Sequence, residues 1–310
     1  MLYKLIIIGS GPAGYTAGIY AGRAGLNPLL FAGEKSGGQL INTMVVENWP
    51  GAKDGVTGPK LMRDLREQAE KFGTKIIDKK VIKVDFSNRP FEIFTPEVKD
   101  AHTSGVYAAG AIIVATGAES IKLNIPGEER LLGRGVATCA VCDALFYRDK
   151  KAAVVGGGDA AVEDALALTK FAKEVVLVVR REELRASKIM QQRVENNPKI
   201  KILWKSQVTE IMGEDKVEAI KINNAETVKT DGVFLAIGHQ PASGIFKGQL
   251  DLDEKGYIKV WQTMTSVQGV FAAGDCVDYR YRQAITAAGM GCQAAIDAEK
   301  YLENKEVGSA

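Results

Sequence analysis

The sequence has few of the residues that mark secreted, metal-binding or membrane proteins. Its 310 residues include only four cysteines and two histidines. Four cysteines in a chain of this length are too few for the disulfide framework of a small secreted domain. No apolar run approaches the roughly 18 residues of a membrane helix, and glycines interrupt the apolar N-terminus before it could form a signal peptide. These absences favour a cytoplasmic protein with no membrane partner.

An excess of charge of one sign is also missing. The chain has 40 Lys and Arg against 38 Asp and Glu, a formal net charge of +2. The resulting field is weak, and no run of Lys and Arg forms a basic arm, so a nucleic acid partner is not expected. The length suffices for two domains, each with its own core.

A first glycine motif follows a strand-like apolar run at Leu5–Ile8 and opens a helix. The motif Gly9–Gly14 has the spacing GxGxxG, which in this context predicts a turn that binds a dinucleotide. Its glycines allow a tight turn, close approach of a pyrophosphate and close helix packing, and the helix N-terminus favours phosphate. Glu34 lies 20 residues further on (34 − 14 = 20), where it could accept a hydrogen bond from a ribose hydroxyl. The alternative is that Glu34 is an ordinary surface acid.

A second motif, Gly156–Ala161, repeats this pattern with alanine at the third position. After the next strand, where a site for NAD would place an acid, the chain has Arg180, Arg181 and Arg185. Guanidinium groups suit the 2′-phosphate of NADP. The alternative is a solvated basic helix start, neutralised by two neighbouring glutamates. Two such sites imply two cofactors, a flavin dinucleotide and an exchangeable nicotinamide.

The order of these motifs predicts an α/β protein made of two Rossmann-like three-layer domains. Strand-like runs that end in glycine at 111–118 and 232–239 bracket the second motif. We therefore expect the second domain, residues 119–244, to be inserted into a discontinuous domain of residues 1–118 and 245–310. Residues 282–302, rich in small side chains, predict a long helix at the end of the first domain.

The close pair Cys139 and Cys142 could bind zinc, form a structural staple or carry electrons as a disulfide. For zinc the pair is half a site, because no second Cys-x-x-Cys exists. The histidines are isolated, His102 in a polar loop and His239 at the end of a strand. We therefore expect no metal.

A redox-active disulfide fits this pair better than a structural one, because a staple across so short a loop constrains the unfolded chain little. Asp143 follows directly and could exchange the proton that thiol–disulfide exchange requires. The alternative for Asp143 is a turn or helix-capping acid. The other two cysteines, Cys276 and Cys292, are expected to be free and buried.

Together these motifs resemble the low-molecular-weight thioredoxin reductases of bacteria and archaea, over essentially the whole chain. The resemblance rests on the ordered set GSGPAGYTAGIYAGRAGL, GGQL, ENWPG, ATGA, CAVCD, GGGDAAVEDAL, RREELRAS, AIGHQP, GVFAAGD and YRQAITAAGMGCQAA. Related flavoproteins that serve ferredoxin or NADH lack a cysteine pair in the inserted domain. The resemblance implies a homodimer with one FAD per subunit that passes electrons from NADPH to thioredoxin.

The resemblance also implies roles for individual residues. Cys142 would be the thiol beside the flavin, Cys139 the thiol that attacks thioredoxin, and Asp143 the acid/base. Asp275 would reach the ribityl chain, and the start of the last helix would stabilise negative charge on the reduced flavin. The implied FAD contacts are Gly9, Gly11, Pro12, Ala13, Glu34, Gly38, Gln39, Asn48, Gly274, Asp275, Arg282, Gln283 and Ala284. The implied NADPH contacts are Gly156, Gly158, Asp159, Ala160, Arg180, Arg181 and Arg185.

Two positions depart from the family pattern. Ala144 stands where glycine usually follows the cysteine motif, which would stiffen that turn, and Val179 replaces a histidine before the paired arginines, which would weaken NADPH binding. Two alternatives stay open. The first is a related flavoprotein that uses another electron donor, such as ferredoxin, or another thioredoxin-like acceptor. The second is a non-catalytic binding module in which the cysteine pair is a vestigial metal half-site. Because the cysteine pair and the nicotinamide loop share one domain, yet both must reach the flavin, we expect that domain to rotate during turnover.

Overall fold

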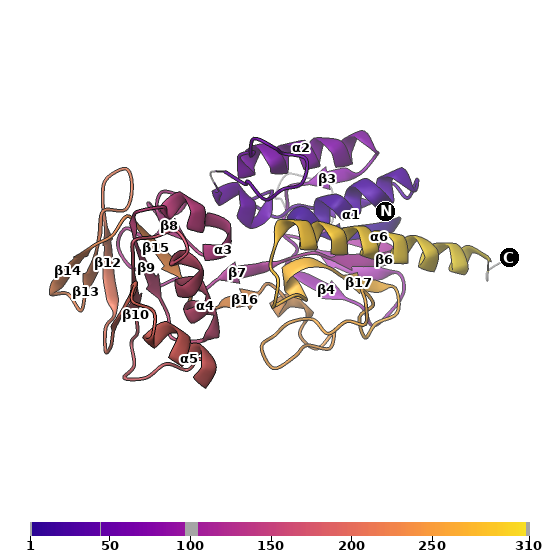
Figure 1. The fold of residues 1–310 in the computed structure, drawn as a ribbon. Coiled ribbons are helices and arrows are strands. Elements are labelled where there is room, and N and C mark those ends of the chain that lie inside the picture. Colours follow the sequence, from indigo (N-terminus) through magenta and orange to yellow (C-terminus); the bar gives the residue numbers. More distant parts are fainter. Residues whose placement is uncertain (1, 44, 97–104, 308–310) are drawn as a thin grey trace. The chain divides into compact units, whose positions relative to one another are not determined.

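The computed structural model describes residues 2–43, 45–96 and 105–307. The chain divides into two compact units, a first unit of Met1–Glu119 with Gln240–Ala310 and a second unit of Ser120–His239 (Figure 1). The second unit is therefore an insertion in the first. The predicted inserted domain, 119–244, extends farther at its C-terminal end than the second unit does. His102, predicted to lie in a polar loop, is outside the described residues.

The first unit is built on a seven-stranded sheet in the order β3-β2-β1-β6-β5-β4, with β17 also paired to β6. Strands β1, β2, β3, β6 and β17 pair in parallel, and their apolar runs are continuous because the sheet is covered on both faces. Strands β4 and β5 are antiparallel, which the sequence did not predict. The strands are β1 (Leu2–Ile8), β2 (Leu29–Phe31), β3 (Lys75–Ile77), β4 (Lys83–Asp85), β5 (Phe91–Phe94), β6 (Val106–Val114) and β17 (Val270–Ala272).

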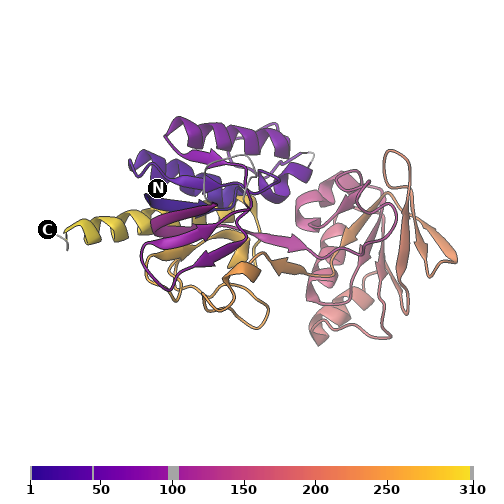
Figure 2. The ribbon, with the colours of Figure 1, turned by 180° about the vertical axis from the view of Figure 1, so that it is seen from behind.

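Three helices, α1, α2 and α6, cover one face of this sheet (Figures 1 and 2). Successive side chains of β1 alternate between two cores: Leu5 and Ile7 pack under the helices, and Ile6 and Ile8 face the opposite side. The helices and 3-10 turns of this unit are α1 (Pro12–Arg23), α2 (Gly58–Lys71), α6 (Ala284–Val307), η1 (Gly38–Asn42), η3 (Gly244–Phe246) and η4 (Gly274–Cys276).

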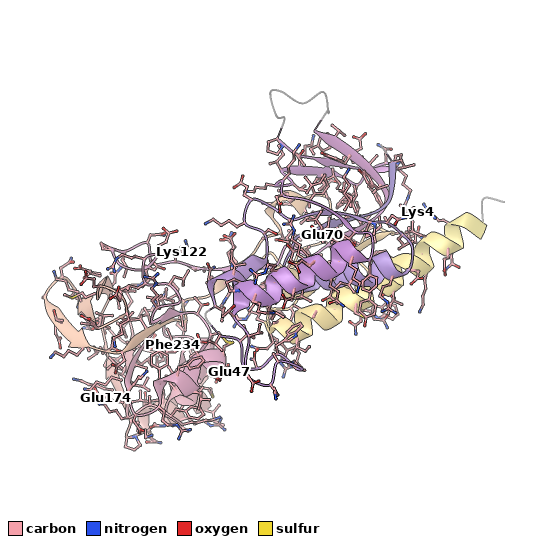
Figure 3. The ribbon with its side chains drawn as sticks, turned by 90° about the horizontal axis from the view of Figure 1, so that it is seen from above. Lys4, Glu47, Glu70, Lys122, Glu174 and Phe234 are labelled. Atoms are coloured by element: carbon pink, nitrogen blue, oxygen red, sulfur yellow. A yellow bond between two sulfur atoms is a disulfide. The ribbon has the colours of Figure 1, made fainter. Side chains whose placement is uncertain are left out.

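The second unit has three layers around a parallel sheet in the order β11-β10-β9-β15-β8. Helices α3, α4 and α5 lie on one face, and an antiparallel meander, β12-β13-β14, lies on the other (Figure 1). In β9, Val154 packs on the helix side and Val155 on the meander side. Phe234 of β15, labelled in Figure 3, is fully buried on the helix side. The elements are β8 (Val136–Ala137), α3 (Ala140–Asp143), η2 (Ala144–Tyr147), β9 (Lys151–Val155), α4 (Asp159–Leu168), β10 (Glu174–Val178), α5 (Lys188–Glu195), β11 (Ile200–Leu203), β12 (Val208–Met212), β13 (Ala219–Ile222), β14 (Glu226–Lys229) and β15 (Gly232–Leu235).

The two segments that connect the units pair with each other as a small two-stranded sheet, β7 (Ala118–Ser120) and β16 (His239–Pro241). The Ser120 hydroxyl and His239 Nε2 are 3.0 Å apart and hydrogen-bonded. His239 thus begins a strand, and the prediction that it ends one is wrong, because the preceding strand already stops at Leu235.

Candidate active site

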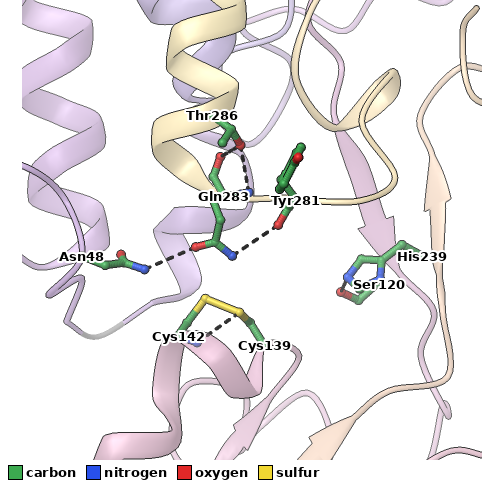
Figure 4. Close-up of a disulfide and its surroundings, with 8 residues drawn as sticks. All are labelled: Asn48, Ser120, Cys139, Cys142, His239, Tyr281, Gln283 and Thr286. Carbon is green, nitrogen blue, oxygen red and sulfur yellow. Dashed lines mark hydrogen bonds between the residues drawn. A yellow bond between two sulfur atoms is a disulfide. The ribbon is translucent and has the colours of Figure 1, made fainter. Parts of the chain in front are cut away.

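Cys139 and Cys142 form a disulfide at the start of the one-turn helix α3, with their Cα atoms 5.4 Å apart (Figure 4). Cys139 is the N-cap residue, and the backbone N–H of Cys142 donates a hydrogen bond to its sulfur at 3.3 Å. Both cysteines are half-buried, while Val141 between them is 72% exposed. A disulfide across so short a loop adds little stability, but its partial exposure suits exchange with another thiol.

Asp143 ends α3 beside this disulfide and is half-buried. Burial raises the pKa of its carboxyl to about 6. Its side chain makes no capping hydrogen bond to the following turn, so the alternative of a capping acid is not supported. A carboxyl that titrates near neutrality can both donate and accept a proton under ordinary conditions.

Ala144 continues the chain from α3 into η2 without strain. It is buried and has φ −56° and ψ −33°, which is right-handed helical backbone that alanine adopts more readily than glycine. The next anchor is Tyr147, which is buried and packs edge-on against Phe234, with ring centroids 5.0 Å apart. The segment that carries the disulfide is thus fastened to the central sheet of its unit.

The second glycine loop joins β9 to α4 in the same unit. Gly156 has φ +149°, and a Cβ there would lie 2.4 Å from the carbonyl oxygen of Ala236, so only glycine fits. Gly158 is the N-cap of α4, and a Cβ there would meet nothing within 4 Å. Because Gly158 has no side chain, no protein atom fills the space beside this helix start, and a phosphate could approach it there.

The arginine segment folds back onto this loop. The backbone N–H of Arg185 donates to the carbonyl oxygen of Gly157 at 2.6 Å. The side chains of Arg180, Arg181 and Arg185 are exposed, and helix α5 begins only at Lys188. The arginines therefore do not start a helix, but their side chains are solvated, as the alternative expected. The backbone of Arg185 is held at the loop, while the three guanidinium groups lie at the surface.

Two acidic side chains beside this loop, Glu182 and Asp159, each have a partner in the second unit. Glu182 pairs with Lys205 at the surface, with the Nζ and a carboxylate oxygen 2.5 Å apart. Asp159 accepts hydrogen bonds from the backbone and hydroxyl of Ser187, at 2.9 and 3.0 Å. Sequence reasoning missed Ser187, because 28 residues separate it from Asp159 and no motif marks it.

Val179 lies in the core rather than at the surface of the nucleotide site. It is buried, and its Cγ1 lies 3.2 Å from where a Cβ of Gly157 would stand. Its backbone N–H and C=O are both bonded, to Leu203 and Ser206. Val179 therefore packs against the glycine loop from the core side.

The first glycine loop, in the first unit, has the same construction. Gly9 has φ +117°, and a Cβ there would lie 2.1 Å from the carbonyl oxygen of Ala115. Gly11 is the N-cap of α1, with no side-chain cap and nothing within 4 Å of its Cβ position, and Pro12 follows as the first helical residue. A dinucleotide pyrophosphate fits this open helix start.

Residues predicted to bind FAD gather around this loop from distant parts of the sequence. A Cβ on Gly38 would lie 3.1 Å from the Cα of Gly11, and a Cβ on Gly274 would lie 3.0 Å from the Cβ of Ala13. Gln39 follows in η1 and is exposed, as is Glu34. The glycines at 38 and 274 thus allow two other segments to reach the loop closely.

The start of α6 is also held in place. The side-chain amide of Asn48 donates to Oε1 of Gln283 at 3.3 Å, and Nε2 of Gln283 donates to the carbonyl oxygen of Tyr281 at 3.4 Å (Figure 4). Arg282 has φ +47°, and Ala284 is the first residue of the helix. Asn48 and Gln283, both predicted FAD contacts, are therefore in direct contact.

Asp275, in η4, is half-buried. Burial, reinforced by the nearby charge of Asp278 and opposed by Arg282, raises the pKa of its carboxyl to about 6. A shielded carboxyl of this kind can hydrogen-bond the hydroxyls of a ribityl chain.

The two other cysteines form no disulfide, and the described residues offer neither a metal site nor a membrane-spanning helix. Cys276 is free and fully buried, as expected. Cys292 is free but only half-buried, so that part of the prediction is wrong. Within the described ranges, no group of three or more His, Cys, Asp or Glu side chains could hold a metal ion. No helix among these residues combines the length and apolarity needed to cross a bilayer.

Comparison with known proteins agrees with this geometry. Residues 3–291 match the family model described as pyridine nucleotide-disulphide oxidoreductase. A thioredoxin reductase of Streptomyces coelicolor is 52% identical over 96% of this chain and 94% of its own.

Solved structures give the same result. The thioredoxin reductase of Streptococcus pyogenes matches with a TM-score of 0.90 and 41% identity, over 98% of this chain and 99% of its own. The thioredoxin reductase of Lactococcus lactis, in its FR conformation, matches with a TM-score of 0.65 and 37% identity, over 97% of this chain and 99% of its own. The chain belongs to the pyridine nucleotide-disulphide oxidoreductase family, as one of its low-molecular-weight thioredoxin reductases.

Proposed function

We propose that this enzyme uses NADPH, through FAD and the Cys139–Cys142 disulfide, to reduce the disulfide of thioredoxin. The observation that carries the proposal is a half-buried disulfide, with a carboxyl of raised pKa next to it, in the same unit as a nucleotide loop bordered by arginines. Bound FAD supplies the chemistry that joins the two halves, because it accepts a hydride from NADPH and passes electrons to a disulfide.

The first unit holds FAD. Its glycine loop and the start of α1 bind the pyrophosphate, Glu34 accepts a hydrogen bond from the adenosine ribose, and Asp275 binds the ribityl chain. The start of α6, beside the Asn48–Gln283 hydrogen bond, would place positive helix-end charge near the flavin when FAD is bound. The full set is Gly9, Gly11, Pro12, Ala13, Glu34, Gly38, Gln39, Asn48, Gly274, Asp275, Arg282, Gln283 and Ala284.

The second unit holds NADPH. The open start of α4 binds the pyrophosphate, and the arginine segment binds the 2′-phosphate, which distinguishes NADPH from NADH. The arginines beside the loop argue against the alternative of a ferredoxin-dependent enzyme, which does not need to bind a 2′-phosphate. The residues are Gly156, Gly158, Asp159, Ala160, Arg180, Arg181 and Arg185.

The reduced cysteine pair carries out the exchange. The Cys139 thiolate attacks one sulfur of the thioredoxin disulfide and forms a mixed disulfide, which releases the first thioredoxin thiolate. The Cys142 thiolate then attacks the sulfur of Cys139, restores the enzyme disulfide and releases the second thiolate. Asp143 exchanges the protons at these thiols, because its pKa near 6 lies close to neutrality.

Turnover requires the second unit to rotate. The disulfide and the nucleotide loop belong to one compact unit, and helix α3 packs against α4 within it. The flavin belongs to the other unit, so the two must take turns at it. The paired connecting strands β7 and β16 are the natural hinge, since all chain crossings occur there. A cross-link between the units should stop turnover, and undiminished thioredoxin reduction in the locked enzyme would contradict the rotation.

The enzyme forms a homodimer in the cytoplasm. Exposed apolar side chains on the paired helices α1 and α6, Tyr20, Ile285 and Ile296, support a dimer face in the first unit. The two free thiols, Cys276 and Cys292, support a reducing compartment. Light scattering should give twice the 33.4 kDa chain mass, and a monomeric mass would contradict the dimer.

Anaerobic titration of the purified protein tests the cofactor assignments. The protein should be yellow, and one equivalent of NADPH should bleach the flavin band, whereas NADH should do so only at much higher concentration. The reduced enzyme should then reduce thioredoxin. A colourless protein that contains zinc, or equal bleaching by NADH, would contradict the proposal.

A further inference from the structure

A polar network in the first unit holds the loop on which Glu34 stands. The Tyr15 hydroxyl and the Ser36 hydroxyl are 2.5 Å apart, and Nη1 of Arg66 donates to the Ser36 oxygen at 3.0 Å. Arg66 also donates to both carboxylate oxygens of Asp78, at 2.7 and 2.9 Å. This set, which we name the Ser36 network, joins α1, the loop before η1, α2 and the residue after β3.

The Ser36 network is held by more hydrogen bonds than an ordinary surface ion pair, although Asp78 is 52% exposed. Tyr15 is buried, and the Arg66 side chain is only 26% exposed. Hydrogen bonds from Arg66 and Ser36 hold the pKa of Asp78 below its usual range. The third guanidinium nitrogen, Nε, donates to Glu70 at 3.1 Å, one turn further along α2. Glu70 is labelled in Figure 3. The bidentate Arg66–Asp78 pair fixes the orientation of the guanidinium as well as pairing its charge.

The loop that Ser36 anchors lies on the glycine turn. The hydroxyl of Ser10, inside the motif, accepts a hydrogen bond from the backbone N–H of Gly37 at 3.0 Å. Gly38 lies so close to Gly11 that a Cβ on it would be 3.1 Å from the Gly11 Cα. Between this contact and the end of β2, Glu34 and its neighbour are exposed to solvent. The position of Glu34 therefore depends on how well the two sides of its loop are anchored.

We propose that Arg66 is a positioning residue for the adenosine half of FAD. Through Ser36 it fixes the loop that presents Glu34 to the ribose, so that binding does not have to order this loop. The inference rests on the proposed function, in which the first unit holds FAD. Arg66 itself touches no reacting group, so its loss should change how tightly FAD is held.

The release of FAD from the full-chain holoenzyme after dilution, followed by flavin fluorescence, tests this inference. Arg66→Met should release FAD about tenfold faster than the wild type, since it removes charge-assisted hydrogen bonds that preorganise the loop. Ser36→Ala removes a single hydroxyl and should act in the same direction, which keeps the test valid if Arg66→Met does not fold. The matched control is Arg63→Met, an exposed arginine one turn earlier on α2. Release from Arg66→Met and Ser36→Ala no faster than from this control would overturn the inference.

A double variant separates positioning from a general loosening of the fold. If Arg66 acts by placing Glu34, then Glu34→Ala and Arg66→Met together should release FAD little faster than the stronger single variant. The inference would be overturned if the double variant released FAD at a rate equal to the product of the two single fold-changes, or if Glu34→Ala alone left the rate unchanged. Either result would leave FAD binding itself intact. A wild-type protein that holds no FAD would instead overturn the proposed function and this inference with it.

Discussion

The backbone N–H of Arg185 donates a hydrogen bond to the carbonyl oxygen of Gly157 at 2.6 Å. This bond ties the arginine segment to the second glycine loop, so the exposed guanidinium of Arg185 stays close to this loop. Arg185→Ala should therefore raise KM for NADPH about tenfold, because a charge-assisted contact to the 2′-phosphate is lost. KM for NADH, which has no such phosphate, should not change.

The control for this prediction is Arg193→Ala, an exposed arginine on α5 of the same unit. Its steady-state constants should equal those of the wild type. An equal rise of KM for both nucleotides in Arg185→Ala would show that the arginine supports the loop and does not read the phosphate.

The open glycines Gly11 and Gly158 predict a loss of binding without a loss of folding. Neither has a positive φ, and a methyl group at either position would meet no protein atom within 4 Å. The methyl would instead occupy the space that a pyrophosphate needs. Gly158→Ala should weaken NADPH binding at least tenfold with FAD content unchanged, and Gly11→Ala should lower FAD content.

Thermal unfolding of Gly158→Ala, compared with Gly156→Ala, tests whether folding is preserved. Midpoints measured without added nucleotide should stay near that of the wild type for Gly158→Ala. Gly156→Ala is the contrast, since its Cβ would clash with Ala236 and should destabilise the second unit. Normal NADPH affinity in Gly158→Ala would refute the placement of the phosphate.

Asp143 predicts a characteristic dependence of stability on pH. Because burial raises the pKa of its carboxyl from its ordinary value near 4 to about 6, the protonated form stabilises the fold. This stabilisation is fully present at a pH below the ordinary pKa near 4, and it is lost as the pH rises through the folded-state pKa of about 6. Asp143→Asn should therefore be more stable than the wild type at pH 8, by about 2 kcal/mol, with no such gain at pH 3.5.

The same substitution should slow thioredoxin reduction about 100-fold, since the proton carrier is gone, while NADPH still bleaches the flavin. Unfolding midpoints at the two pH values and single-turnover rates measure the two effects. Asp149→Asn, an exposed acid in the same unit, should show neither. A stability gain that is equal at both pH values would show that the raised pKa is not the cause.

Ala144 predicts a small contribution to stability from local backbone conformation. Because its φ and ψ are right-handed helical, glycine at this position should lower the free energy of unfolding by about 1 kcal/mol. Ala144→Gly should nonetheless reduce thioredoxin at an undiminished rate. Denaturant unfolding and steady-state assays together measure this, and a stability equal to that of the wild type would contradict it.

The parts of the fold that the sequence predicts are those with strong local signals. The unit of β1, glycine loop and α1 combines a fully buried apolar run with positions where only glycine fits, such as Gly9. The meander was not predicted, because strands such as β14 (Glu226–Lys229) are mostly exposed and polar. Cys292 was placed wrongly because α6, rich in small residues, shows no clear apolar stripe from which to predict exposure.

The site shows the same division between local and long-range information. The cysteine pair and both loops can be identified from spacing alone. The raised pKa of Asp143 depends on burial by the folded unit, and the bond between Asn48 and Gln283 joins residues 235 positions apart. The Ser36 network likewise joins α1 to Arg66 and Asp78 through contacts that no motif records.

The central claim is that electrons leave the flavin through the disulfide. The most direct test compares the wild type with Cys139→Ser under anaerobic conditions, with NADPH and thioredoxin. The variant should bind FAD, and NADPH should bleach its flavin band at the rate of the wild type, because the nucleotide site is unchanged. Its thioredoxin reduction should fall below 1% of that of the wild type, since no thiol is left to attack the substrate. Sustained thioredoxin reduction by Cys139→Ser would contradict the account.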